Sequence, residues 1–283
     1  MKSDCFDITA GHSDSHCLKF TQLYDPEYYT GRYHSEVCLE HAAQHGQSAY
    51  YGFAFKIAVD WEFNSNYDDL YNRISIAQFI SNFKDVDCGD TGHSKGAVPS
   101  TMVWIQNDEL YTKLRSGDPC HDTYNIEEFK IGRVTPGEWH SVVIGAYWHK
   151  DKVGWFKVWY DQQLKLDKQF IKTFMDTDDR SFEFRVGLYP NWYNWNDEGH
   201  PFIKESGQRK KVIYMDKIGY GQTFSDADPH TLREGVGKGY KKIKTSDTLV
   251  SANSTTINNG VESIVTYVRL RSVPADCIGF GCS

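Results

Sequence analysis

The segment Phe182-Glu183-Phe184-Arg185-Val186-Gly187-Leu188-Tyr189 alternates between two kinds of side chain. Its even-numbered positions are apolar, whereas the odd-numbered positions include Glu183, Arg185 and Tyr189. Successive side chains of a β-strand point to opposite faces of a sheet, so the segment predicts a strand with one face in a core. The other face combines ionisable and aromatic groups, which is typical of a groove lining.

Comparable segments, rich in β-branched and aromatic residues, recur along the chain between Gly, Asp and Asn turns. We expect strands over 32–40, 50–63, 73–80, 100–106, 139–148, 154–160, 181–189, 211–220 and 262–270. Only 106–116 and 228–236 are compatible with short helices. The pattern predicts an all-β protein, a β-jelly-roll sandwich of two antiparallel sheets with a concave substrate groove.

Two more of these strands have a face that would line the same groove. The residues expected on these faces are Arg32, His34, Glu36, Trp155, Lys157 and Trp159. We expect one domain over 1–283, with 237–283 as a C-terminal extension packed on it, because 237–261 is polar and a strand pattern resumes after it.

Composition narrows the possible partners. A net charge of −7 argues against nucleic acid, which needs a broad basic surface. No stretch approaches the roughly 18 apolar residues of a membrane-spanning helix, so we expect a soluble protein, and a monomer. Aromatic residues reach 15%, more than a core can hold, and exposed aromatic rings commonly contact sugars.

The seven cysteines lack the paired spacing of a zinc site and suit disulfides in an oxidising compartment. Plausible pairs are Cys5–Cys17, Cys88–Cys120 and Cys277–Cys282, with Cys38 left over, although spacing does not determine connectivity. A glycosylation sequon at Asn253 also fits export. We therefore expect a secreted, extracellular protein.

Arg185 and Tyr189 lie four residues apart on one strand face and suggest a chemistry. Eliminating across a uronic acid linkage requires a donor that neutralises the C6 carboxylate, a base for the C5 proton and an acid for the leaving O4. An Arg with a Tyr offers such groups, because a nearby cation helps a phenol to ionise. A plain Arg–Tyr contact on a solvent face would explain the pattern equally well.

Several motifs resemble known lyases. Arg185-Val186-Gly187-Leu188-Tyr189, His34-Ser35-Glu36-Val37 and Ala77-Gln78-Phe79 resemble strands of jelly-roll alginate lyases. Residues 138–140, 154–161 and 214–219 are similar to the glucuronan lyases, polysaccharide lyase family 20. The resemblance runs from about residue 27 to 229 and implies a polysaccharide lyase.

The resemblance also assigns roles. It makes Tyr189 the general acid/base, Gln78 a carboxylate neutraliser, and His34 either a neutraliser or a base. Ile80 stands where alginate lyases have a His, which favours a mechanism centred on Tyr189. The resemblance implies a structural Ca²⁺ with Asp216 as a ligand, and no organic cofactor.

Other residues are candidates for substrate binding. They are Arg32, Lys157, Trp104, Trp155, Trp159 and Trp192. The two cations would pair with substrate carboxylates and the indoles would stack on sugar rings, while surface charge and core packing are equally good explanations.

We therefore expect a lyase that cleaves an anionic uronic-acid polymer, β-1,4-glucuronan, at internal bonds by β-elimination. A glycoside hydrolase on the same fold would need two facing carboxylates, for which only Glu36 and Glu183 are available in the groove. A non-catalytic carbohydrate-binding lectin would need only the aromatic residues. An ultraviolet-absorbing unsaturated product distinguishes the lyase from both.

Overall fold

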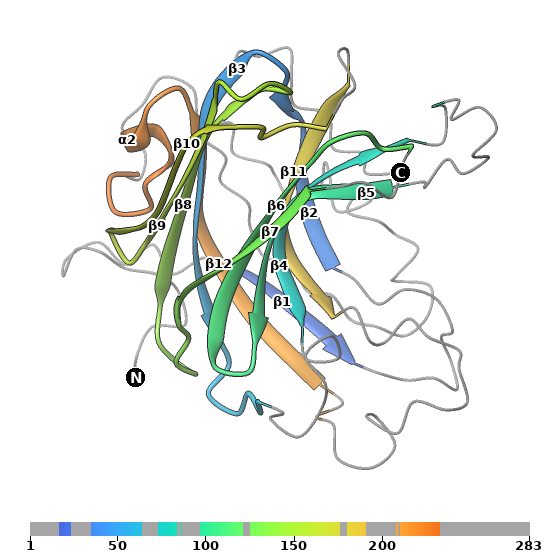
Figure 1. Cartoon of the computed structure of the whole chain (residues 1–283). Helices are drawn as coiled ribbons and strands as arrows, with labels where there is room; N and C mark the ends of the chain where they lie inside the picture. The colour runs from blue at the N-terminus through green and yellow to red at the C-terminus, as the bar shows by residue number, and fades with distance from the viewer. Residues whose placement is uncertain are drawn as a thin grey trace, which may run out of the picture.

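Two six-stranded antiparallel sheets make up the protein, packed face to face (Figure 1). The computed structural model describes residues 17–23, 35–63, 73–83, 86, 97–120, 125–175, 180–190, 208 and 210–232. In spatial order, the first sheet contains β1 (Leu18–Leu23), β12 (Lys210–Gly221), β3 (Gln47–Ile57), β8 (His140–Trp148), β9 (Gly154–Tyr160) and β10 (Gln163–Ile171). The second contains β2 (Ser35–Gln44), β11 (Ser181–Pro190), β4 (Ile74–Asn82), β5 (Ala97–Gln106), β6 (Glu109–Ser116) and β7 (Asn125–Arg133). This arrangement confirms the predicted jelly-roll sandwich.

The core lies between the inner faces of the two sheets. Phe184 of β11 stacks on Phe79 of β4, with ring centroids 4.9 Å apart, and lies 5.3 Å from the ring of Tyr51 on β3 of the opposite sheet. Val186 and Leu188 continue the buried side of β11. The apolar side of the segment 182–189 therefore faces the core, as its alternation predicts.

The sequence pattern identified eight of the described strands and missed four. Residues 106–116 were expected as a helix, but β6 is a strand in which Leu110, Thr112 and Leu114 are buried and the residues between them are not. The other missed strands are β1, which is short, and β7 and β10, each of which is an edge strand of its sheet. An outermost strand of largely exposed residues shows no apolar alternation, which is why β7 and β10 were missed.

One short helix, α2 (Phe224–Ala227), follows β12 and lies outside the first sheet (Figure 1). The helix expected at 228–236 is absent from the described part of that range, where Asp228–Leu232 form a turn after α2. Residues 233–236 lie outside the described residues. Phe224 packs edge-on against Trp159 of β9, 4.9 Å away. Among the described residues, no helix has the length and apolar character needed to cross a membrane. The expected strand 262–270 and the expected extension 237–283 lie outside the described residues.

Candidate functional site

The outward side of the second sheet, which we call the polar face, carries the candidate chemistry. In β11, Arg185 alternates with the buried Phe184 and Val186, so its side chain lies on this face. The strand register then places Arg185 directly beside Gln78 of β4 on one side and Cys38 of β2 on the other. Arg185 and Gln78, which lie far apart in the sequence, are thereby neighbours on adjacent strands.

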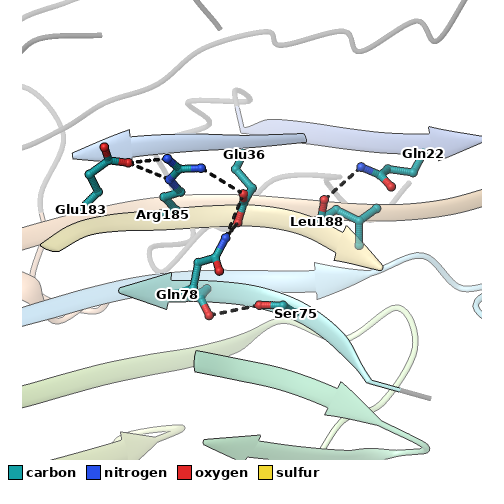
Figure 2. Close-up of polar contacts among 8 residues, drawn as sticks. Gln22, Glu36, Ser75, Gln78, Glu183, Arg185 and Leu188 are labelled. Atoms are coloured by element: carbon teal, nitrogen blue, oxygen red, sulfur yellow. Dashed lines mark hydrogen bonds and ion pairs between the residues drawn. The ribbon is translucent and has the colours of Figure 1, made fainter. Parts of the chain in front are cut away.

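A carboxylate links these two residues (Figure 2). The amide nitrogen of Gln78 donates to both oxygens of Glu36, at 2.8 and 3.1 Å. Arg185 Nη1 lies 3.9 Å from Glu36 Oε2, while its Nε and Nη2 donate to Glu183 Oε2 at 2.8 and 2.6 Å. The result is a continuous chain of polar contacts, Glu183–Arg185–Glu36–Gln78, across three strands.

Glu36 is the most deeply placed acid of this cluster, with a side chain only 6% exposed. Burial raises the pKa of Glu36 from 4.5 to about 7, against the opposing effects of the Arg185 charge and the Gln78 hydrogen bond. Glu183 adds a smaller upward effect because it is a like charge. A carboxyl group with this pKa can hold or release a proton near neutral pH, as residues of acid–base sites commonly do.

Gly187 explains how Glu36 comes so close to β11. A Cβ at Gly187 would lie 2.2 Å from the carbonyl oxygen of Ser35 and 2.7 Å from Cα of Glu36, and its φ of +152° disfavours other residues. The missing side chain of Gly187 therefore accommodates the backbone of β2.

Tyr189 lies on the polar face at the end of β11, half-buried, in register with Ser75 of β4. Tyr189 lies four residues after Arg185, and Leu188, the residue before Tyr189, is fully buried in the core. The side chains of Tyr189 and Arg185 therefore lie on the same face of the sheet. The structure therefore brings Tyr189, Arg185 and Gln78 together on adjacent strands of one face. His34, the remaining predicted catalytic residue, lies outside the described residues, immediately before β2.

Three predicted binding residues lie elsewhere. Trp155, Lys157 and Trp159 belong to β9 of the first sheet, on its outer side, so the prediction that they line one groove with Arg185 is wrong. Lys157 pairs with Asp167 of β10 at 3.0 Å. The two indoles flank the ring of Tyr50, with centroids 5.8 and 6.1 Å away. Alternation predicts the face of a strand but not the sheet to which the strand belongs.

Trp104 is on the polar face, but it is covered. Only 1% of it is exposed, because its ring stacks on Tyr111 with centroids 5.6 Å apart and the Arg73 guanidinium lies 4.9 Å above it. The prediction of an open sugar platform at Trp104 is therefore wrong. Two further candidates, Arg32 and Trp192, lie outside the described residues.

Asp216 lies on β12 of the first sheet, and its Oδ1 accepts a hydrogen bond from the Lys217 amide at 2.7 Å. Across the part of the chain that the structure describes, no three His, Cys, Asp or Glu residues cluster as metal ligands would. Asp216 therefore contributes one carboxylate, and these residues alone do not make up the six to eight oxygens of a calcium site.

The cysteines depart from the predicted pairing. Cys17 is buried and is not in a disulfide, which rules out Cys5–Cys17. Cys38, expected to be left over, is disulfide-bonded, as is Cys120. Spacing alone misassigned the odd cysteine because disulfides join residues that the fold brings together.

The sequence analysis missed a group of charged residues on the polar face, namely Arg73, Lys113, Arg115 and Glu128. Arg73 binds both oxygens of Glu128, at 2.6 and 3.1 Å. Lys113 and Arg115 alternate with buried residues of β6. This alternation is typical of a strand, but the same segment is also compatible with a helix, and the helix was expected.

Comparisons with known proteins find similarity to lyases. Residues 8–219 match the family model described as polysaccharide lyase. The crystal structure of an endo-β-1,4-glucuronan lyase from the fungus Trichoderma reesei is 37% identical, with 77% of this chain and 86% of that chain covered and a TM-score of 0.65. The alginate lyase AlyC3 is more distant, at 14% identity, 74% and 76% coverage, and a TM-score of 0.46. No protein of curated function matches the sequence.

Proposed function

Because this chain belongs to the polysaccharide lyase family, we propose that it cleaves β-1,4-glucuronan at internal linkages by β-elimination. That it is a lyase acting on a uronic-acid polysaccharide follows from the family. The observation that supports glucuronan as the polymer is the similarity to the fungal glucuronan lyase over most of both chains. The internal bond and the choice of polymer are the proposed part.

In this reaction a base removes the C5 proton, the C4–O4 bond breaks, a C4–C5 double bond forms, and O4 leaves with a proton from an acid. We assign the acid–base steps to Tyr189, with His34 as a second candidate group. Tyr189 is half-buried on the same face as Arg185, and its phenol oxygen is the group that would exchange the proton.

We assign neutralisation of the C6 carboxylate to Gln78 together with Glu36. The Gln78 amide already donates to one carboxylate, that of Glu36, and a substrate carboxylate brought beside it would be a second negative charge. Since the pKa of Glu36 is already about 7, this like charge would favour its protonated form. A protonated Glu36 can donate to the substrate carboxylate and stabilise the enolate that forms when C5 is deprotonated.

Hydrolysis of the glycosidic bond is less compatible with this arrangement. Glu36 and Glu183 are the acids that the sequence offered for it, and both contact the same Arg185 side chain. A hydrolase places its two carboxyl groups on opposite sides of the scissile bond. Two acids held by one guanidinium do not leave a sugar between them.

Replacing Tyr189 with Phe tests the mechanism. The change removes one oxygen and keeps the ring, so kcat should fall by about 10²–10⁴ with little change in KM. The measurement is the ultraviolet absorbance of the unsaturated product formed from glucuronan. Tyr147→Phe, a tyrosine on the first sheet, is the matched control and should retain normal turnover. Near-normal turnover by Tyr189→Phe would overturn the mechanism.

We also propose a bound calcium ion with Asp216 among its ligands. If the ion is structural, chelation should lower Tm and added Ca²⁺ should restore it, because a ligand of the folded state stabilises that state. The readout is a thermal unfolding curve. The Asp216→Asn variant should lose this response, and an unchanged Tm of the original protein in chelator would reject the site.

Secretion into an oxidising, extracellular environment is proposed from the disulfide bonds at Cys38 and Cys120. For Cys120 we propose Cys88 as the partner. We propose that the enzyme acts as a monomer, on a polymer too large to enter cells.

A further inference from the structure

A continuous row of side chains crosses the polar face from the proposed catalytic cluster to the far edge of the sheet. The register places Arg185 beside Gln78, and Gln78 beside Met102 of β5. Met102 lies beside Lys113 of β6, which lies beside Glu128 of β7. Lys113 is therefore two strands from Gln78, about 10 Å at the usual strand spacing.

Positive charge accumulates at the Lys113 end of this row. Arg115 follows two residues later on the same face of β6, and Arg73 approaches from the start of β4. The carboxylate in register with Lys113, that of Glu128, already has both oxygens bound by Arg73. Within the described part of the chain, no carboxylate lies at ion-pair distance from the Lys113 ammonium.

Lys113 is also withdrawn from water. Burial lowers its pKa to about 8, and the neighbouring charges of Arg115 and Arg73 act in the same direction, against Glu128. A half-buried cation with two guanidinium groups near it is less favourable than one with an anion beside it. An arriving carboxylate would relieve this repulsion.

An aromatic ring accompanies the charges. Tyr111, two residues before Lys113 on the same face, is half-exposed and rests on the buried indole of Trp104 with an interplanar angle of 13°. Its ring is held in place from below. A flat, fixed ring beside cations suits a sugar that carries a carboxylate, because the ring stacks on the C–H face of a pyranose.

We propose that Tyr111, Lys113 and Arg115 form a second subsite, which binds the carboxylate of a uronate residue remote from the bond that is cleaved. The subsite rests on the proposed function, because a uronic-acid polymer carries one carboxylate on each sugar. A chain lying across the strands along the row would place one sugar at Gln78 and a later one at Lys113. The subsite contributes binding and takes no part in the elimination itself.

Lys113→Met tests this subsite, because it removes the charge and keeps most of the side-chain volume. KM for long glucuronan should rise about tenfold while kcat stays within twofold, as expected for lost uniform binding. On the shortest oligosaccharide that is cleaved, KM should stay within twofold. Lys113→Arg should restore most of the affinity, because it returns the charge.

Lys165→Met is the matched control, because it removes an equally charged side chain from β10 of the other sheet. It should leave KM unchanged. If Lys113→Met does not fold, as judged by circular dichroism, Arg115→Met replaces it with the same expected rise in KM. An unchanged KM on long polymer in a folded variant overturns the subsite.

Failure of the proposed function gives a different result. If the unmodified protein releases no unsaturated product from glucuronan, the activity is rejected, and calorimetric binding of glucuronan then tests the subsite. Weaker binding by Lys113→Met than by Lys165→Met supports the subsite, and equal binding overturns it.

Discussion

At the scale of single residues, Glu36 shows how a fold changes a side chain's chemistry. In the sequence it is one acid in a strand of mixed polarity. In the structure it is almost fully buried beside Gln78 and Arg185, and its pKa rises to about 7. The protonated form of Glu36 is therefore available near neutral pH.

This raised pKa predicts a pH-dependent stability. Below pH 4.5 Glu36 is protonated in both folded and unfolded chains, and its stabilising contribution is fully present. Above that pH the unfolded chain ionises first, so the contribution is lost as pH rises through about 7. The shift from 4.5 to about 7 corresponds to about 3 kcal/mol at most.

The side chain of the Glu36→Gln variant cannot ionise, so its free energy of unfolding should not fall as pH rises through about 7. Urea unfolding of both proteins at pH 5 and pH 8 measures this difference. At pH 8 the variant should be more stable, relative to the unmodified protein, than it is at pH 5. Glu183→Gln is the control, because Glu183 lies on the same Arg185 and is more exposed. Parallel pH profiles for the original protein and Glu36→Gln would contradict the raised pKa.

At the scale of strands, β9 and β11 show what alternation predicts and what it leaves open. Both strands have a buried apolar side and an opposite side of aromatic and charged residues. They nevertheless belong to different sheets, so their outward sides face away from each other. Only the pairing of strands distant in sequence determines which outward side carries the cluster.

Trp155→Ala should therefore leave kcat and KM on glucuronan within about twofold of normal. Trp155 packs against Tyr50 on the outer side of the first sheet, so the loss should appear in stability, at about 1–3 kcal/mol. Product absorbance and thermal unfolding measure the two effects. A rise in KM with unchanged stability would contradict this expectation and show that Trp155 binds the substrate.

At the scale of the whole molecule, two cysteines in or next to the second sheet are disulfide-bonded. Cys38 lies in β2 beside Arg185, and Cys120 follows β6. Cys17 precedes β1, is 7% exposed and is not in a disulfide. A chain of seven cysteines must leave at least one outside a disulfide, and among the described cysteines Cys17 is such a residue.

Alkylation of the unfolded, non-reduced protein should therefore label one cysteine, and peptide mapping should place the label on Cys17. In the folded protein the same label should react much more slowly, because the thiol is buried. Protein treated first with a reductant is the control and should take up seven labels. Seven labels without reductant would place the protein in a reducing compartment and remove the argument for secretion.

The sequence alone determined the fold class and which face of most strands is buried. It also determined that Arg185 and Tyr189 lie on the same face of β11. These depend on alternation, which is a local property that burial of one side imposes on every strand. It also indicated Gln78, Arg185 and Tyr189, which the structure brings to one face. Alternation did not reveal the edge strands β7 and β10, because little of their surface is buried.

Tertiary structure decided which strands lie side by side, and hence which polar residues meet. The contacts of Glu36 with Gln78 and Arg185, and the placement of Arg73 over Trp104, arise between residues far apart in sequence. So does the placement of Trp155, Lys157 and Trp159 on the other sheet. Desolvation and charge proximity depend on distances in space, and a single sequence does not contain those distances.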